Sequence, residues 1–111
     1  MKPRIGIDIV DVAEFERTLR KGGDAFKERC FHESEIGNGS PEHLAGVFAA
    51  KEAVIKALSL PNESWPNVRI GRDKSGKPFA EYLGDDICIK ESDLSISHDK
   101  KFAVASYVAF L

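Results

Sequence analysis

Cysteine is scarce in this sequence, and the common motifs for zinc and for nucleotide phosphates are missing. Its 111 residues include two cysteines, Cys30 and Cys88, with no C-x-x-C pair and no histidine at ligand spacing. This pattern argues against structural zinc and predicts two reduced, partly buried thiols. Neither G-x-x-x-x-G-K-[ST] nor G-x-G-x-x-G occurs. The sequence therefore offers no support for a P-loop or a Rossmann nucleotide site.

Long hydrophobic runs and a strong excess of one charge are also missing. No apolar run approaches the length of a membrane span, which is about 18 residues. Residues 1–4 lead into a strand pattern rather than the apolar segment of a signal peptide. The net charge of −2 lacks the basic excess of a duplex-binding protein. We therefore expect one cytoplasmic domain over residues 1–111, with no membrane and no nucleic-acid partner.

The first ten residues predict a β-strand that carries an acid at its centre. Its two sides are Ile5, Ile7 and Ile9, and Gly6, Asp8 and Val10. Gly6 leaves room for another group to approach beside Asp8. A buried carboxylate is costly unless it is paired, hydrogen-bonded or bound to a metal. Asp8 is thus a candidate functional residue, and the alternative is an acid at a strand edge that is solvated or caps a neighbouring amide.

The remaining patterns change from helical to alternating along the chain. Asp11 caps a helix that Gly22 and Gly23 end, and a short helix follows over residues 24–29. Ser40 and Pro41 begin a long helix that reaches Leu58. Two hairpins follow, one joining residues 68–70 to 79–82 and the other joining 94–98 to 102–108. This order predicts an α+β fold, with an antiparallel sheet packed on the long helix.

Three further polar residues are candidates for chemistry. Glu52 and Lys56 lie four residues apart on one face of the long helix. As a surface ion pair they contribute only about 0.3–0.5 kcal/mol. If folding brings Glu52 near Asp8, the two carboxylates suit Mg²⁺ and Lys56 suits a phosphate group. His98 ends a strand, where it is either a polar cap or part of a site.

Taken together, four segments resemble holo-acyl-carrier-protein synthase, the small bacterial class of 4′-phosphopantetheinyl transferases. They are Gly6–Val10, Phe26–Arg29 with Glu35 downstream, Leu44–Ala57 and Ser95–His98. The turn segment Asp73–Pro78 is also similar to the hairpin of that family. The likeness runs from about Ile5 to Val108, and its most specific part is the helix motif F-A-x-K-E-A-x-x-K.

The resemblance implies the 4′-phosphopantetheinyl transferase fold and transfer of 4′-phosphopantetheine from coenzyme A to a serine of apo-acyl carrier protein. Adenosine 3′,5′-bisphosphate would be released, in a step of lipid metabolism and fatty acid biosynthesis. Asp8 and Glu52 would bind Mg²⁺, Lys56 would contact phosphate, and His98 would lie close to the coenzyme. Glu52 and Lys56 would be the catalytic residues, and either Glu52 or a metal-held water would take the serine proton. The family also implies a homotrimer with sites at subunit interfaces.

Three positions depart from the family pattern. Glu14 stands where an arginine commonly docks the acidic carrier protein, and Val47 replaces an arginine that binds coenzyme phosphate. Residues 59–62 replace a G-T-G loop, although glycine lets a backbone approach a ligand closely. These changes motivate a second hypothesis, a non-catalytic relative that binds coenzyme A or a carrier protein. A structural module with a coincidental motif is the third.

Overall fold

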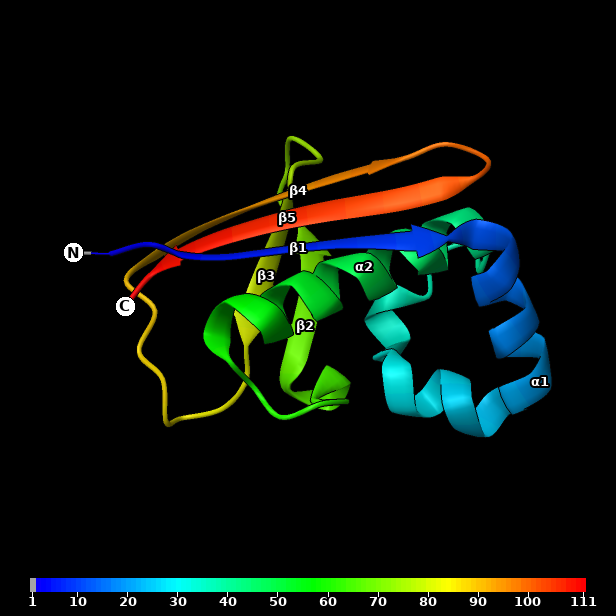
Figure 1. Cartoon of the computed structure of the whole chain (residues 1–111), viewed down its shortest axis with the longest axis horizontal. Coiled ribbons are helices and arrows are strands. Elements are labelled where there is room, and N and C mark those ends of the chain that lie inside the picture. Colours follow the sequence, from blue (N-terminus) through cyan, green and yellow to red (C-terminus); the bar gives the residue numbers. More distant parts are fainter. Residues whose placement is uncertain (1) are drawn as a thin grey trace.

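The computed structural model describes residues 2–111 and contains two antiparallel sheets with two main helices. In chain order, the elements are β1 (Arg4–Asp11), α1 (Val12–Cys30), η1 (Glu33–Glu35), α2 (Pro41–Leu58), η2 (Trp65–Asn67), β2 (Val68–Arg72), β3 (Pro78–Tyr82), β4 (Glu91–His98) and β5 (Phe102–Phe110). The α+β prediction is confirmed, including the long helix and the two hairpins. In Figure 1 the longer sheet lies across α2, and α1 sits at one end of the molecule.

The main sheet has the order β1-β5-β4, with both pairings antiparallel. Asp8 is paired with Ala105, which is paired in turn with Ile96. Paired residues point to the same face of a sheet, so this register sets which side chains face α2. The second sheet is the hairpin of β2 and β3, closed by the turn at Gly76 (φ 89°). The first strand of the chain thus becomes an edge strand beside the last.

Helix α2 is buried on nearly all sides. Ser40 caps it by accepting from the backbone N–H of His43 (3.2 Å), and Pro41 is its first residue, as the sequence predicts. It packs against small residues on the inner face of β5, namely Ala103, Ala105 and Ala109. Gly6 of β1 also faces it, and a Cβ there would overlap the carbonyl oxygen of Ala53. The small side chains bring the β1 backbone against α2, which carries Glu52 and Lys56.

Helix α1 begins at the predicted cap and bends at the predicted break. The Asp11 carboxylate accepts from the backbone N–H of Glu14 (2.9 Å). Gly23 has φ 64° and ψ −156°, outside the helical region, so the element is two helical segments that meet at a kink. None of the helices within residues 2–111 has the length and apolar character needed to cross a membrane.

The two thiols differ from the prediction that both are partly buried. Cys30 is fully buried at the end of α1, whereas Cys88 is exposed, and both are free. Burial raises the pKa of the Cys30 thiol to about 12. The sequence pattern missed this difference because Cys88 lies in the irregular segment before β4, where no periodicity indicates burial.

Candidate active site

Asp8 lies at the centre of β1 with its side chain on the face that packs on α2. Its side chain is 17% exposed, and its Oδ1 is 3.1 Å from Nζ of Lys56. Two features place it there. Side chains alternate between the two faces of β1, and Gly6, two residues earlier on the same face, lets β1 approach α2 closely. Asp8 is therefore a mostly buried carboxylate that has an ion-pair partner, and the interpretation of a solvated strand-edge acid is wrong.

Lys56 reaches from the last turn of α2 to β1 rather than along its own helix. Its ammonium donates to the carbonyl oxygen of Ile7 (2.9 Å) and to Oδ1 of Asp8. Across residues 2–111 the structure shows no ion pair between Lys56 and Glu52. The interpretation of these two residues as a surface pair on one helix is thus wrong. The Lys56 side chain remains more than half exposed, so it is accessible to a ligand.

Glu52 and Asp8 line the same cavity, which has a volume of about 360 Å³. Two more acids, Asp11 and Glu14, share its wall, together with the rings of Phe15, Phe26 and Phe48. Burial raises the pKa of the Glu52 carboxyl above its usual value, and the negative charge of Asp8 raises it further. A hydrogen bond from the Trp65 indole acts in the opposite direction.

The donor set at this cavity fits magnesium better than it fits a transition metal. No group of three or more His, Cys, Asp or Glu residues suited to a metal ion occurs within the described chain. Magnesium requires no such cage, because it takes one or two carboxylates and completes its shell with water and substrate phosphate. Asp8 and Glu52 could supply that minimal set.

His98 lies apart from the two carboxylates. It lines a second cavity, of about 250 Å³, with His43, Gly46, Val47, Ile96 and Arg72. The register puts His98 on the same sheet face as Asp8 but two strands away, and α2 packs between them. Within one chain, therefore, the fold brings Asp8, Glu52 and Lys56 together and leaves His98 in a different cavity.

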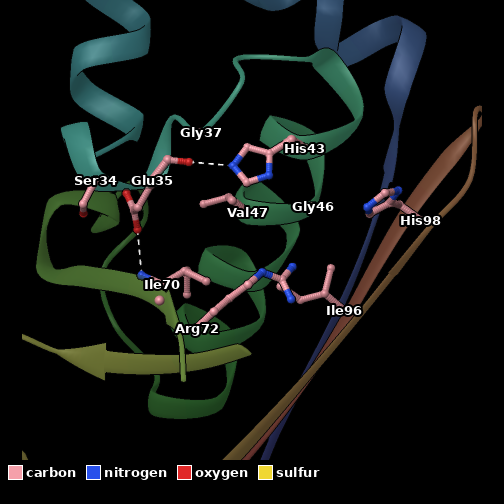
Figure 2. A pocket seen from close by; sticks show the side chains of 11 residues that line it. Ser34, Glu35, Gly37, His43, Gly46, Val47, Ile70, Arg72, Ile96 and His98 are labelled. Atoms are coloured by element: carbon pink, nitrogen blue, oxygen red, sulfur yellow. Dashed lines mark hydrogen bonds between the residues drawn. The ribbon is translucent and has the colours of Figure 1, made fainter. Parts of the chain in front are cut away.

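Arg72 was missed in the sequence because it ends a short strand and belongs to no motif. Figure 2 shows its side chain extending toward Ile96, and Val47 is another of the residues that line this cavity. Its guanidinium donates to the Gly76 carbonyl (2.8 Å). A positive charge is thus available beside Val47, the position where the resemblance predicts a lost arginine.

A buried ion pair lies next to Glu52 along α2, and the sequence pattern did not predict it. Nζ of Lys51 lies 2.7 Å from Oε1 of Glu35, and both side chains are fully buried. Lys51 also donates to the carbonyl oxygens of Cys30 (2.8 Å) and Trp65 (3.1 Å). Lys51 and its partners are far apart in the sequence, and in the sequence Lys51 is only one more charged residue of a predicted helix. The contact therefore becomes visible only in the folded chain.

Comparison with known proteins identifies the family. The model of the 4′-phosphopantetheinyl transferase superfamily matches residues 4–108. A holo-[acyl-carrier-protein] synthase of Alkaliphilus metalliredigens is 39% identical over 118 residues, which cover 95% of this chain and 96% of that protein. One from Nautilia profundicola is 40% identical over 109 residues, covering 94% and 96%.

Solved structures agree with these matches. The holo-[acyl-carrier-protein] synthase of Helicobacter pylori, in complex with coenzyme A, superposes with a TM-score of 0.88 at 33% identity, covering 96% of this chain and 99% of that one. A synthase from Bacillus anthracis gives a TM-score of 0.77 at 37% identity, covering 96% and 94%. The predicted fold and enzyme class are thereby confirmed. On this evidence the chain belongs to the 4′-phosphopantetheinyl transferase superfamily.

Proposed function

We propose that this chain transfers 4′-phosphopantetheine from coenzyme A to a serine hydroxyl of apo-acyl carrier protein, in a Mg²⁺-dependent reaction. The observation that carries this proposal is the shared cavity of Asp8 and Glu52, with Lys56 against Asp8. The H. pylori relative is described in complex with coenzyme A, and the B. anthracis relative in complex with "CoA (3′,5′-ADP)". Both support the same donor here.

The reaction breaks one phosphorus–oxygen bond of the coenzyme pyrophosphate and forms another to the serine oxygen. The serine proton must pass to a base, and adenosine 3′,5′-bisphosphate leaves. Such a transfer depends on charge neutralisation and in-line positioning more than on covalent help. The chain therefore needs cationic groups at the phosphates and a carboxylate near the serine.

Asp8 and Glu52 would hold Mg²⁺, which when bound supplies positive charge to the pyrophosphate oxygens. Lys56 would bind a phosphate oxygen while its contact with Asp8 orients it. Glu52 is also one of two candidates for the base, beside a metal-held water. Burial makes its carboxylate more basic than an ordinary glutamate, since it raises the pKa.

His98 and Arg72 would bind the coenzyme in the second cavity. The two side chains supply cationic or hydrogen-bonding groups above an apolar floor that includes Val47 and Ile96. Anionic groups of the coenzyme would meet Arg72 there. This would offset the missing arginine at position 47.

A homotrimer would unite the two cavities at a subunit interface. On the face of the main sheet that points away from α2, strand β1 is apolar, and its isoleucines are well exposed: Ile5 (66%), Ile7 (60%) and Ile9 (65%). Their partners on β5 are Val108, Ser106 and Val104, so the valines continue the apolar surface on either side of one serine. A contiguous apolar patch of this kind is typical of a protein interface. A neighbouring subunit on this face would cover the isoleucines of β1, the edge strand that also carries Asp8.

The test is transfer itself. Purified protein is incubated with coenzyme A, Mg²⁺ and a panel of apo-carrier proteins that includes those of the source organism, and each carrier is weighed by mass spectrometry. We expect one carrier to gain a phosphopantetheine, and Glu52→Ala to abolish the gain while its circular dichroism stays native. No gain on any carrier would refute the transferase, and binding of coenzyme A without transfer would favour the non-catalytic relative.

A further inference from the structure

The indole of Trp65 is hydrogen-bonded to the carboxylate that lines the acidic cavity. Its Nε1–H donates to Oε2 of Glu52, with 3.3 Å between the two atoms. Within residues 2–111 the structure shows no hydrogen bond to the other oxygen, Oε1. The carboxylate is thus held on one side and left open on the other.

Trp65 is itself rigidly placed. Its side chain is only 6% exposed and packs between Phe48 (centroids 5.5 Å apart) and Phe26 (6.0 Å). The guanidinium of Arg29 lies 5.7 Å from the indole ring centroid. Its backbone carbonyl accepts from the buried ammonium of Lys51, which is one residue before Glu52 on α2. Because both ends of the tryptophan are anchored to α2, the indole has little freedom to leave Glu52.

We propose that Trp65 is a positioning residue, whose indole N–H orients the Glu52 carboxylate so that Oε1 faces the cavity shared with Asp8. The inference rests on the proposed function, in which Glu52 and Asp8 hold Mg²⁺. A carboxylate that ligates a metal works best when its other oxygen is fixed, because an outer hydrogen bond sets the orientation of the ligand.

A purely structural role for the hydrogen bond makes a different prediction. A buried indole N–H needs some acceptor, and Glu52 could serve only that need. In that case loss of the N–H would change stability but not metal binding. The two roles are therefore separated by a metal measurement rather than by activity.

The decisive variant is Trp65→Phe, which removes the N–H and keeps an aromatic ring among Phe26 and Phe48. Binding of Mn²⁺, a paramagnetic substitute for Mg²⁺, is followed by electron paramagnetic resonance with coenzyme A present. We expect the dissociation constant of Mn²⁺ to rise roughly 10–100-fold. In turnover assays the Mg²⁺ concentration for half-maximal rate should rise in parallel, with a smaller change in the rate at saturating Mg²⁺.

Phe31→Leu is the matched control. Phe31 is a buried ring that contacts Phe15 edge-on (6.3 Å between centroids) and has no hydrogen bond to lose. We expect it to lower stability and leave Mn²⁺ affinity unchanged. Equal Mn²⁺ affinity in Trp65→Phe and wild type would overturn the proposal. If wild type fails to transfer but Trp65→Phe still weakens Mn²⁺ binding, the proposed function falls and the positioning role stands.

A second measurement needs no variant at Trp65. It is the only tryptophan in the chain, so intrinsic fluorescence reports on this indole alone. With coenzyme A present, Mg²⁺ should produce a saturable change in emission in wild type, since the metal withdraws charge from the carboxylate that the indole contacts. Glu52→Ala should abolish the change. If Mg²⁺ leaves the emission of wild type unchanged, the proposed link between Trp65 and the metal site is contradicted.

Discussion

Lys56 shows how one side chain takes its role from the fold. Four residues after Glu52, it could form an ordinary helical ion pair, yet its ammonium crosses to β1 and binds Asp8 and the Ile7 carbonyl. Two contacts explain this arrangement. The Ile7 carbonyl on β1 gives the ammonium a second acceptor, and Glu52 has its own partner in Trp65. The ammonium therefore lies between a carboxylate and open solvent, where a phosphate group can reach it.

Replacing Lys56 with alanine should damage transfer far more than stability. We expect the turnover rate to fall roughly 10²–10³-fold, as when one preorganised donor is lost from an active site. The exposed pair of Lys77 and Asp93 (2.8 Å) provides the control, and Lys77→Ala should leave the rate unchanged. Both variants should lose at most about 1 kcal/mol of unfolding free energy. Equal rates for the two variants would remove Lys56 from the proposed machinery.

Cys30 makes stability depend on alkaline pH. Its pKa is about 12 in the folded chain against 9.0 for the free thiol, because burial disfavours the thiolate. Between these values the unfolded chain loses the proton and the folded chain keeps it, so stability falls as pH rises. The loss contributed by this thiol is about 1.4 kcal/mol per pH unit.

The check is urea unfolding between pH 8 and pH 11 for wild type and Cys30→Ala. Other groups titrate in this range, so the difference between the two slopes isolates the thiol. The same burial predicts that a thiol reagent modifies Cys88 in the native protein and Cys30 only after unfolding. Parallel slopes in the two proteins would show that Cys30 ionises equally in both states.

At the scale of elements, the pair of Lys51 and Glu35 joins α1, η1, η2 and β2 to α2. Glu35 accepts from the backbone N–H of Ile70 (2.7 Å), and Lys51 donates to the carbonyls of Cys30 and Trp65. Burial lowers the pKa of Lys51, which the contact with Glu35 opposes. The pair therefore determines where the loop that carries Trp65 sits relative to Glu52.

Breaking this pair should be costly. Lys51→Met leaves the Glu35 carboxylate buried without its cation, and we expect a loss of about 3–5 kcal/mol of unfolding free energy. The double variant Lys51→Met/Glu35→Gln removes both charges and should recover part of the loss. Thermal or urea unfolding measures both proteins. A double variant no more stable than the single one would show that the hydrogen bonds, not the unpaired charge, dominate.

At the scale of the whole molecule, the main sheet has one covered and one open face. Helix α2 packs against one face of the main sheet, the face that carries Asp8 (Figure 1). The isoleucines of β1 alternate with Asp8 and are exposed on the other face. Three exposed isoleucines on an edge strand are a liability unless another chain covers them. This is the physical basis for the proposed trimer.

Ile7→Glu tests the assembly without disturbing the subunit core. Ile7 is 60% exposed, so the charge should cost the isolated subunit little. We expect wild type to have three times the chain mass by light scattering, and the variant to have the mass of one chain and no transfer activity. Leu83→Glu, at an exposed leucine (48%) just after β3, should keep the trimer. A trimer in both variants would place the interface elsewhere, and a monomeric wild type would refute it.

Much of this molecule follows from local sequence rules. Asp11 and Ser40 cap their helices, Gly23 breaks α1, and the two hairpins lie where alternating runs flank turn residues. These features depend on backbone chemistry within a few residues, so the sequence determines them. The motif around Glu52 likewise lies within one helix, which sets its spacing, and it is part of the family match over residues 4–108.

Only the tertiary structure decided which polar groups meet. Lys56 pairs with Asp8, Lys51 with Glu35, and Glu52 with Trp65, although no pattern links these residues along the chain. The tertiary structure also places His98 in a different cavity from Asp8 and Glu52. Arg72 lines the cavity of His98. Such contacts depend on strand register and on how closely Gly6 lets β1 approach α2. Local propensities encode neither the strand register nor the distance between β1 and α2.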